Sequence, residues 1–320
     1  MQAEAIPPVV FEIGLNHLGK ADSAKRMIDT LASNGAPHIT RQVIDDPKRH
    51  TRNPDRIAML NQYYLSIEDN IAVLRHAIKT GLKAGAAILN ISDIGPSLDA
   101  GVSFFKVLST DFAFEPLLAA LAVTGVPTYL SVGISTASDI ARSLSVMRNA
   151  SEGSNERLLY TVLGAPGPAE KLNLRRIATL SRTFNVPVAY GQHSDRLEAL
   201  AIAIAFGAES VFVYVAQTHS PEPPDGPHAV LCSEAAAILR NIRAAASMLG
   251  TPDLETSTDN PLRHTHRRSI VAAKPIRSGL VISEEDLAFK HPGTGLPSSQ
   301  WMQVIGRTAN RDYAVDEDLF

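Results

Sequence analysis

The sequence predicts a closed (β/α)₈ barrel followed by a small, β-rich C-terminal domain. Two observations predict the barrel: apolar, β-branched segments alternate with helical segments, and about 210 residues contain eight such units. Near-continuous apolar strands are typical of a parallel sheet buried on both faces, and eight strand–helix units close such a sheet on itself. The predicted strands are Val9–Asn16, His38–Val43, Ala86–Ile91, Ser103–Ser109, Thr128–Ile134, Leu158–Leu163, Val186–Gln192 and Ser210–Ala216.

Polar residues collect where the predicted strands end. In a barrel of this kind the chemistry lies at the carboxyl ends of the strands, because only the loops there can vary without disturbing the packed interior. Position alone therefore makes a set of strand-end residues candidates for an active site: Glu12, Asn16, His17, Gln42, Asn90, Lys106, Ser109, Ser131 and His193.

Composition narrows the partners and the location. The 320 residues carry a formal net charge of −3, which provides neither a basic stripe for nucleic acid nor a polybasic patch for a membrane surface. The single cysteine, Cys232, excludes an internal disulfide framework. No apolar stretch approaches the ~20 residues of a membrane span, and the N-terminus lacks the order of a signal peptide. We therefore expect a cytoplasmic protein with neither a nucleic acid nor a membrane as its partner.

A change of composition marks the domain boundary. The segment Gly250–Thr265 is rich in Gly, Pro, Thr and Asp, has no hydrophobic period and predicts a linker. We expect the barrel over residues 1–250, the linker over 251–265 and the second domain over 266–320. About 55 residues are marginal for an independent core, so this domain is expected to pack on its own barrel or on that of a second subunit.

The sequence resembles a known family over nearly its whole length. The resemblance is carried by the segments Phe11–His17, Phe105–Ser109, Ser131–Gly133, Arg267–Ala272, Lys290–Gly295 and Ile305–Arg307. These are similar to the sialic acid (N-acetylneuraminate) synthases, whose barrel carries a C-terminal antifreeze-like (SAF) domain. The resemblance implies a homodimer in which each SAF domain caps the partner's active site. It also implies that phosphoenolpyruvate (PEP) condenses with an amino-sugar aldehyde on a divalent metal, giving a nine-carbon 2-keto (nonulosonic) acid and phosphate.

The resemblance assigns roles to individual residues. Lys106, Ser109 and Ser131 match phosphate-contacting positions, in agreement with the cations and hydroxyl donors that a PEP site requires. We expect Glu12, Gln42 and Lys106 to be catalytic. The expected substrate-binding residues are Ser109, Ser131, Asp111 at an acidic position, Asn90 where the family has a threonine, and Arg268, which matches the SAF arginine that reaches the sugar. The structural alternative for each is a strand-end polar residue that caps a helix or bonds a loop.

The metal site departs from the family pattern. Family members hold the metal with two histidines, of which the first is retained as His193 and the second is replaced by Val215. Valine has no ligand atom, and one imidazole with waters is a weak site, so either the metal is lost or other groups supply ligands. A manganese- or magnesium-like ion would then need His193 and a further ligand from the eighth loop. The candidates there are His219, Glu222, Asp225 and His228, of which His228 is the one we select.

Other departures fall on the same pocket and keep three interpretations open. The family's second-strand lysine is Thr40, and the neighbouring Arg41 points to the opposite face of a regular strand. An Asn-x-Tyr that contacts PEP has become Leu163-Gly164-Ala165. The first interpretation is a PEP-using synthase with an altered metal and sugar site. The second is another carbon–carbon bond enzyme in which Lys106 forms a Schiff base, and the third is a non-catalytic homologue that binds a sugar acid.

Overall fold

The computed structural model describes residues 7–44, 46–250 and 261–320. The chain divides into two compact units, Met1–Gly250 and Thr251–Phe320. No helix in the described part of the chain has the length and apolar character needed to cross a membrane.

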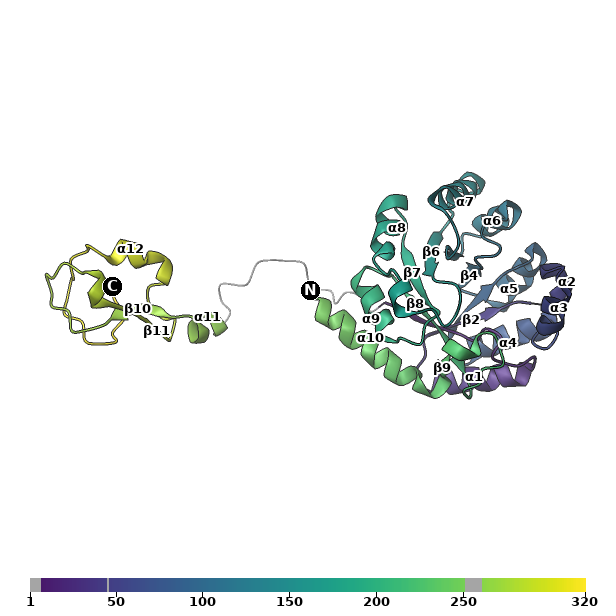
Figure 1. Ribbon diagram of the computed structural model, residues 1–320, viewed down its shortest axis with the longest axis horizontal. Coiled ribbons are helices and arrows are strands. Elements are labelled where there is room, and N and C mark those ends of the chain that lie inside the picture. The colour runs from purple at the N-terminus through teal and green to yellow at the C-terminus, as the bar shows by residue number, and fades with distance from the viewer. Residues whose placement is uncertain (1–6, 45, 251–260) are drawn as a thin grey trace. The chain divides into compact units, whose positions relative to one another are not determined.

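The first unit is an eight-stranded parallel barrel with helices around it, as the sequence predicts (Figure 1). Each strand pairs in parallel with the next, and β1 pairs with β8 so that the sheet closes. A short strand β9 (Val230–Leu231) pairs in parallel with the end of β8. The barrel strands are β1 (Val9–Glu12), β2 (His38–Gln42), β3 (Lys83–Ala87), β4 (Phe104–Val107), β5 (Thr128–Ser131), β6 (Glu156–Thr161), β7 (Val188–Gln192) and β8 (Val211–Ala216).

The strands end earlier than the apolar pattern indicates. β1 was expected to extend to Asn16 but ends at Glu12, and β3 ends at Ala87, before Asn90. Ile13 and Ile88 are nevertheless fully buried in the loops that follow. The apolar pattern therefore continues beyond the last hydrogen-bonded residue of the strand. It indicates which residues are buried and not which residues pair with a neighbouring strand.

Helices cover the outside of the sheet because each has one apolar face. In α1, the buried residues Ala24, Met27, Ile28 and Leu31 recur at the helical period. The helices of the first unit are α1 (Ala21–Ser33), α2 (Pro47–His50), α3 (Pro54–Leu60), α4 (Ile67–Lys79), α5 (Ile94–Ala100), α6 (Glu115–Ala122), α7 (Ala137–Ala150), α8 (Arg176–Phe184), α9 (Glu198–Ala205) and α10 (Ala235–Leu249). Short 3₁₀ turns lie at η1 (Ile91–Asp93), η2 (Ala169–Lys171), η3 (Gly226–His228) and η4 (Cys232–Glu234).

Aromatic residues fill the amino-terminal part of the barrel interior. Phe104, Tyr129 and Phe212 contact one another edge to face, with ring centroids 4.9–6.1 Å apart. The Phe104 ring lies where a Cβ on Gly85 would be, 2.0 Å from its nearest atom, so glycine makes room for it. Successive inward side chains are two residues apart along a strand. The next inward layer, toward the carboxyl ends, therefore consists of polar residues: Glu12, Lys106, Ser131, Thr161 and Tyr214.

The second unit has its own small core and a two-stranded antiparallel sheet. It contains α11 (Pro261–His266), β10 (Ser269–Ala272), η5 (Glu284–Asp286), β11 (Leu287–Lys290), η6 (Ser298–Gln300) and α12 (Trp301–Val304). Ile270, Ile282, Val304 and Tyr313 belong to its buried cluster. The helix α11 occupies the end of the expected linker. The rest of that linker, residues 251–260, lies outside the described residues.

Candidate active site

A polar cavity of about 160 Å³ opens at the carboxyl ends of the barrel strands, and we call it the inner cavity. It brings together five of the residues that the sequence singles out, from strands β2, β4, β5 and β7 and the loops that follow them. Its lining is Gln42, Arg56, Lys106, Leu108, Ser109, Thr110, Ser131, Leu159, Thr161, Leu163, Gly191, His193 and Tyr214.

A buried ion pair lies at the base of this cavity. Lys106 Nζ contacts Glu12 Oε1, and both side chains are only 4% exposed. The same ammonium lies 5.7 Å from the ring centroids of Phe212 and Tyr214. A buried charge is strongly destabilising without its partner, so each residue requires the other. Glu12 Oε2 is buried and has no hydrogen-bond partner among the described residues.

Two histidines meet beside this ion pair. The ring centroids of His193 and His228 are 5.2 Å apart, and Tyr214 lies 4.7 Å from His228 and 5.3 Å from His193. Burial, together with the Lys106 charge, lowers the pKa of His193 to about 3 and that of His228 to about 4. Both imidazoles are therefore neutral at pH 7. Neither ring nitrogen of His228 has a hydrogen-bond partner in the described part of the chain.

Of the four eighth-loop residues named above, His228 is the one for which the described part of the chain shows a ring contact with His193. Asp225 accepts a hydrogen bond from the backbone N of Leu15 at 2.7 Å, and His219 is exposed. The backbone oxygen of Glu222 accepts a bond from the Tyr63 hydroxyl at 3.3 Å. Within residues 7–44, 46–250 and 261–320, no three His, Cys, Asp or Glu side chains come together as a metal site.

Arg41 does not enter the cavity. Its side chain is completely buried, and Nη1 donates to the backbone oxygen of Gly14 at 3.1 Å. Burial lowers its pKa to about 9, although the nearby Asp225 opposes this shift. Burial also raises the pKa of Asp225 to about 6. Arg41 therefore supports the first βα loop and does not take the place of a cation at Thr40.

A second cavity of about 230 Å³, which we call the outer cavity, adjoins the first. The two share Gln42, Arg56, Leu108 and Thr110. The outer cavity is lined by Gln42, Ile44, His50, Thr51, Arg56, Leu60, Leu89, Leu108, Thr110 and Asp111. Asp111 thus belongs to the outer cavity only. The sequence analysis did not identify Arg56, Thr110, Thr161 or Tyr214 as site residues. Thr161 and Tyr214 could have been found, because each follows an inward-pointing apolar residue by two positions and therefore also points inward.

The two remaining predicted substrate-binding residues are Asn90 and Arg268. Asn90 lines neither cavity, and its amide donates to Asp93 Oδ2 at 3.2 Å. This placement follows from the early end of β3, which puts Asn90 in the turn before η1. Arg268 belongs to the second unit, where its guanidinium lies 4.7 Å from the Phe289 ring centroid.

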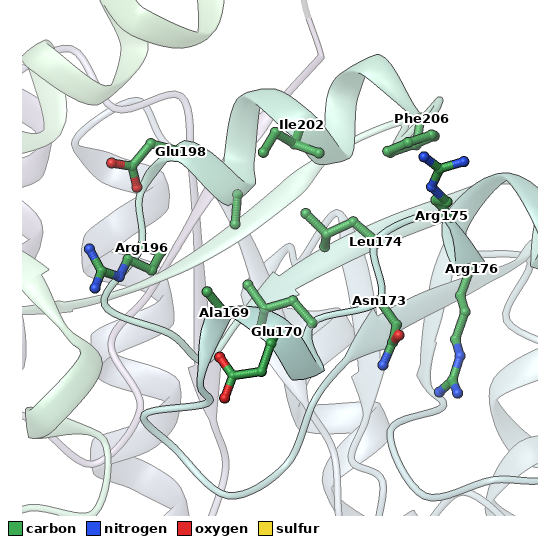
Figure 2. A pocket seen from close by; sticks show the side chains of 12 residues that line it. Ala169, Glu170, Asn173, Leu174, Arg175, Arg176, Arg196, Glu198, Ile202 and Phe206 are labelled. Atoms are coloured by element: carbon green, nitrogen blue, oxygen red, sulfur yellow. The ribbon is translucent and has the colours of Figure 1, made fainter.

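A larger cavity of the first unit lies away from the strand-end candidates. It has a volume of about 650 Å³ and is bordered by Leu174, Ile202, Phe206 and several charged side chains from the loop before α8 and from α9 (Figure 2). None of the strand-end candidates lines it. The inner cavity, although smaller, contains the charged and polar groups that chemistry requires, and we therefore take it as the candidate active site.

The unprotonated state of His17 predicts a loss of stability in acid. His17 is fully buried, and burial together with the Arg41 charge lowers its pKa to about 2. Between pH 6.5 and pH 2 the unfolded chain therefore binds a proton that the folded chain does not, and the stability present above pH 6.5 is lost as the pH falls. One such group changes the free energy of unfolding by about 1.4 kcal/mol per pH unit.

Between pH 6.5 and pH 5 the free energy of unfolding of the wild type should fall. We expect the fall to be about 2 kcal/mol smaller in the His17→Asn variant. Urea unfolding at both pH values measures the difference. His219→Asn, in an exposed loop, is the control and should lose as much as the wild type. Equal losses for His17→Asn and the wild type would show that His17 does not contribute.

Comparison with known proteins places the whole chain in one group. The NeuB family model matches residues 25–253, and the SAF domain model matches residues 267–317. An uncharacterized protein of Methanocaldococcus jannaschii is 29% identical, over 98% of this chain and 93% of its own length. The N,N'-diacetyllegionaminic acid synthase of Campylobacter jejuni is 22% identical, over 97% of both chains.

Solved structures agree with this assignment. The crystal structure of N-acetylneuraminic acid (sialic acid) synthetase from Leptospira borgpetersenii, in complex with citrate, matches with a TM-score of 0.73 and 25% identity, over 78% of this chain and 87% of that one. The NeuB match covers more than half of the 320 residues, and the barrel described above is the architecture of the matched structure. The chain therefore belongs to the NeuB family and carries a C-terminal SAF domain.

Proposed function

We propose that this protein is a nonulosonic acid synthase that condenses PEP with an amino-sugar aldehyde. The observation that carries the proposal is the convergence of Lys106, Ser109 and Ser131 in one cavity at the barrel mouth. Relatives named as legionaminic, pseudaminic and sialic acid synthases support the reaction class. In this reaction the PEP methylene carbon bonds to the aldehyde carbon, one water is consumed, and phosphate is released.

The cavity supplies hydroxyl donors for the phosphate of PEP. Ser109 Oγ and Thr161 Oγ1 are buried and have no hydrogen-bond partner among the described residues. Both line the inner cavity, together with the buried Ser131. Unsatisfied buried hydroxyls are costly, and a bound phosphate oxygen would satisfy them.

The Lys106–Glu12 pair positions charge beneath this group of hydroxyls. The ammonium attracts the anionic substrate, and its contact with Glu12 Oε1 fixes where that charge lies. The free Oε2 of Glu12 can accept a proton or a hydroxyl of the acceptor. The ion pair also argues against Schiff-base chemistry, because an amine that forms a Schiff base must attack in its uncharged form.

The residues present fit a divalent transition metal held by two imidazoles. His228 has two buried ring nitrogens without partners, and its ring lies 5.2 Å from that of His193. His228 would thus replace in space the ligand that Val215 cannot provide. Imidazole nitrogens suit manganese, zinc or cobalt better than magnesium. A metal bound there would polarise the aldehyde oxygen of the acceptor.

An activity assay tests the proposed reaction. With PEP and a panel of N-acetylated amino-sugar aldehydes, we expect phosphate release and a 2-keto acid detectable by mass spectrometry. Lys106→Met should lower kcat/KM by about 100-fold or more, because a charge aimed at the reacting group is lost. Lys83→Met, exposed at the other end of the barrel, is the matched control and should keep full activity.

The double variant Glu12→Gln/Lys106→Met removes both buried charges and separates loss of activity from loss of folding. It should unfold at a higher urea concentration than Lys106→Met and remain inactive. Full activity in Lys106→Met, or a wild type that does not bind PEP, would contradict the proposed function.

Metal analysis tests the proposed ligands independently of activity. After dialysis against Mn²⁺ and removal of free metal, the wild type should retain about one ion per chain. His193→Ala and His228→Ala should each lose it, whereas His219→Ala, a histidine of the same loop that is exposed, should not. A metal-free wild type, or His228→Ala with full metal content, would rule out this ligand pair.

We also propose that the protein is a homodimer. The C-terminal unit has a small core and exposes large apolar side chains, among them Met302 at 78% and Val281 at 61%. Light scattering at micromolar concentration should give about twice the mass of one 34.4 kDa chain. A monomer under these conditions would refute the dimer.

A further inference from the structure

Among the described side chains that line the inner cavity, Arg56 is the cation without an anionic partner. Lys106 is neutralised by the Glu12 carboxylate that it contacts. PEP carries both a phosphate and a carboxylate, and binding such an anion requires a positive charge that is not already offset within the protein.

Arg56 lies where this charge is needed. It is the only arginine that lines either cavity in the described part of the chain, and it lines both. None of the ion pairs found among the described residues includes Arg56. Its guanidinium is therefore free to bind an anion at the junction between the inner and outer cavities.

The helix that carries Arg56 is held against the barrel mouth. The Asn53 side chain caps α3 by accepting bonds from the backbone N of Asp55 and of Arg56, at 2.9 and 3.1 Å. At the other end of the helix, Leu60 packs in a buried cluster with Leu15 and Ile44. Both ends of α3 are thus fixed, and the Arg56 side chain begins from a defined position beside the cavities.

We propose that Arg56 binds the phosphate of PEP from the second βα loop and separates the PEP-binding inner cavity from an acceptor-binding outer cavity. This inference rests on the proposed function. A guanidinium offers two parallel donors that match two phosphate oxygens, so it can both neutralise and orient the group. The acceptor would then lie against Gln42, Thr51 and Asp111, which supply both donors and acceptors for sugar hydroxyls.

Calorimetric titration of PEP into the full-length protein tests the assignment. Arg56→Gln should weaken the Kd for PEP by about 10-fold or more, since one charge-assisted contact is lost. Arg56→Lys, which keeps the charge but not the paired donors, should fall between that variant and the wild type. Arg52→Gln is the matched control, because Arg52 is exposed in the same loop and lines neither cavity.

Inorganic phosphate, titrated in the same way, should show the same order of affinities, because the phosphate is the group that Arg56 is proposed to bind. If Arg56→Gln binds PEP as the wild type does while Lys106→Met does not, the role of Arg56 is refuted and the proposed function stands. If Arg56→Gln affects only the KM for the acceptor, Arg56 belongs to the outer cavity and the assignment is wrong. A wild type that binds neither PEP nor phosphate overturns both proposals.

Discussion

The buried pair of Lys106 and Glu12 is the constraint on which the rest of the barrel mouth depends. Two charges that are each 4% exposed must remain in contact, and this joins β4 to β1 across the barrel interior. The aromatic layer of Phe104, Tyr129 and Phe212 lies beneath the pair and fills the barrel, so a ligand can approach only from the carboxyl ends of the strands. The polar layer above the aromatic rings therefore covers the packed core on one side and lines the inner cavity on the other.

The first and eighth βα loops are joined by polar contacts that restrict one side of this mouth. Asp225 accepts a bond from Leu15, and Arg41 donates to Gly14, whose φ of +52° and closeness to Asp225 leave no room for a side chain. The eighth loop, held in this way, brings His228 next to His193.

Much of the fold follows from the sequence because the signal is local and repeated. A buried parallel strand needs an apolar run, and eight such runs separated by helices specify a closed barrel without knowledge of any single contact. The positions of Lys106, Ser131 and His193 at the mouth follow from the same rule. Asn90 is an exception and does not lie at the end of a strand. Ile88 is buried beyond the end of β3, so the apolar pattern continues into a loop and makes the strand look longer than it is.

By itself the sequence determined the barrel, the C-terminal domain, the family resemblance and five of the residues that line the inner cavity. Only the tertiary structure decided which loop residues join them, because a loop has no period from which side-chain direction can be inferred. It brought His228 to His193, kept Asp225 at the first loop, turned Arg41 away from the cavity and placed Arg56 between two cavities. Each of these placements depends on contacts between segments that are distant in sequence, and such contacts arise only when the barrel closes.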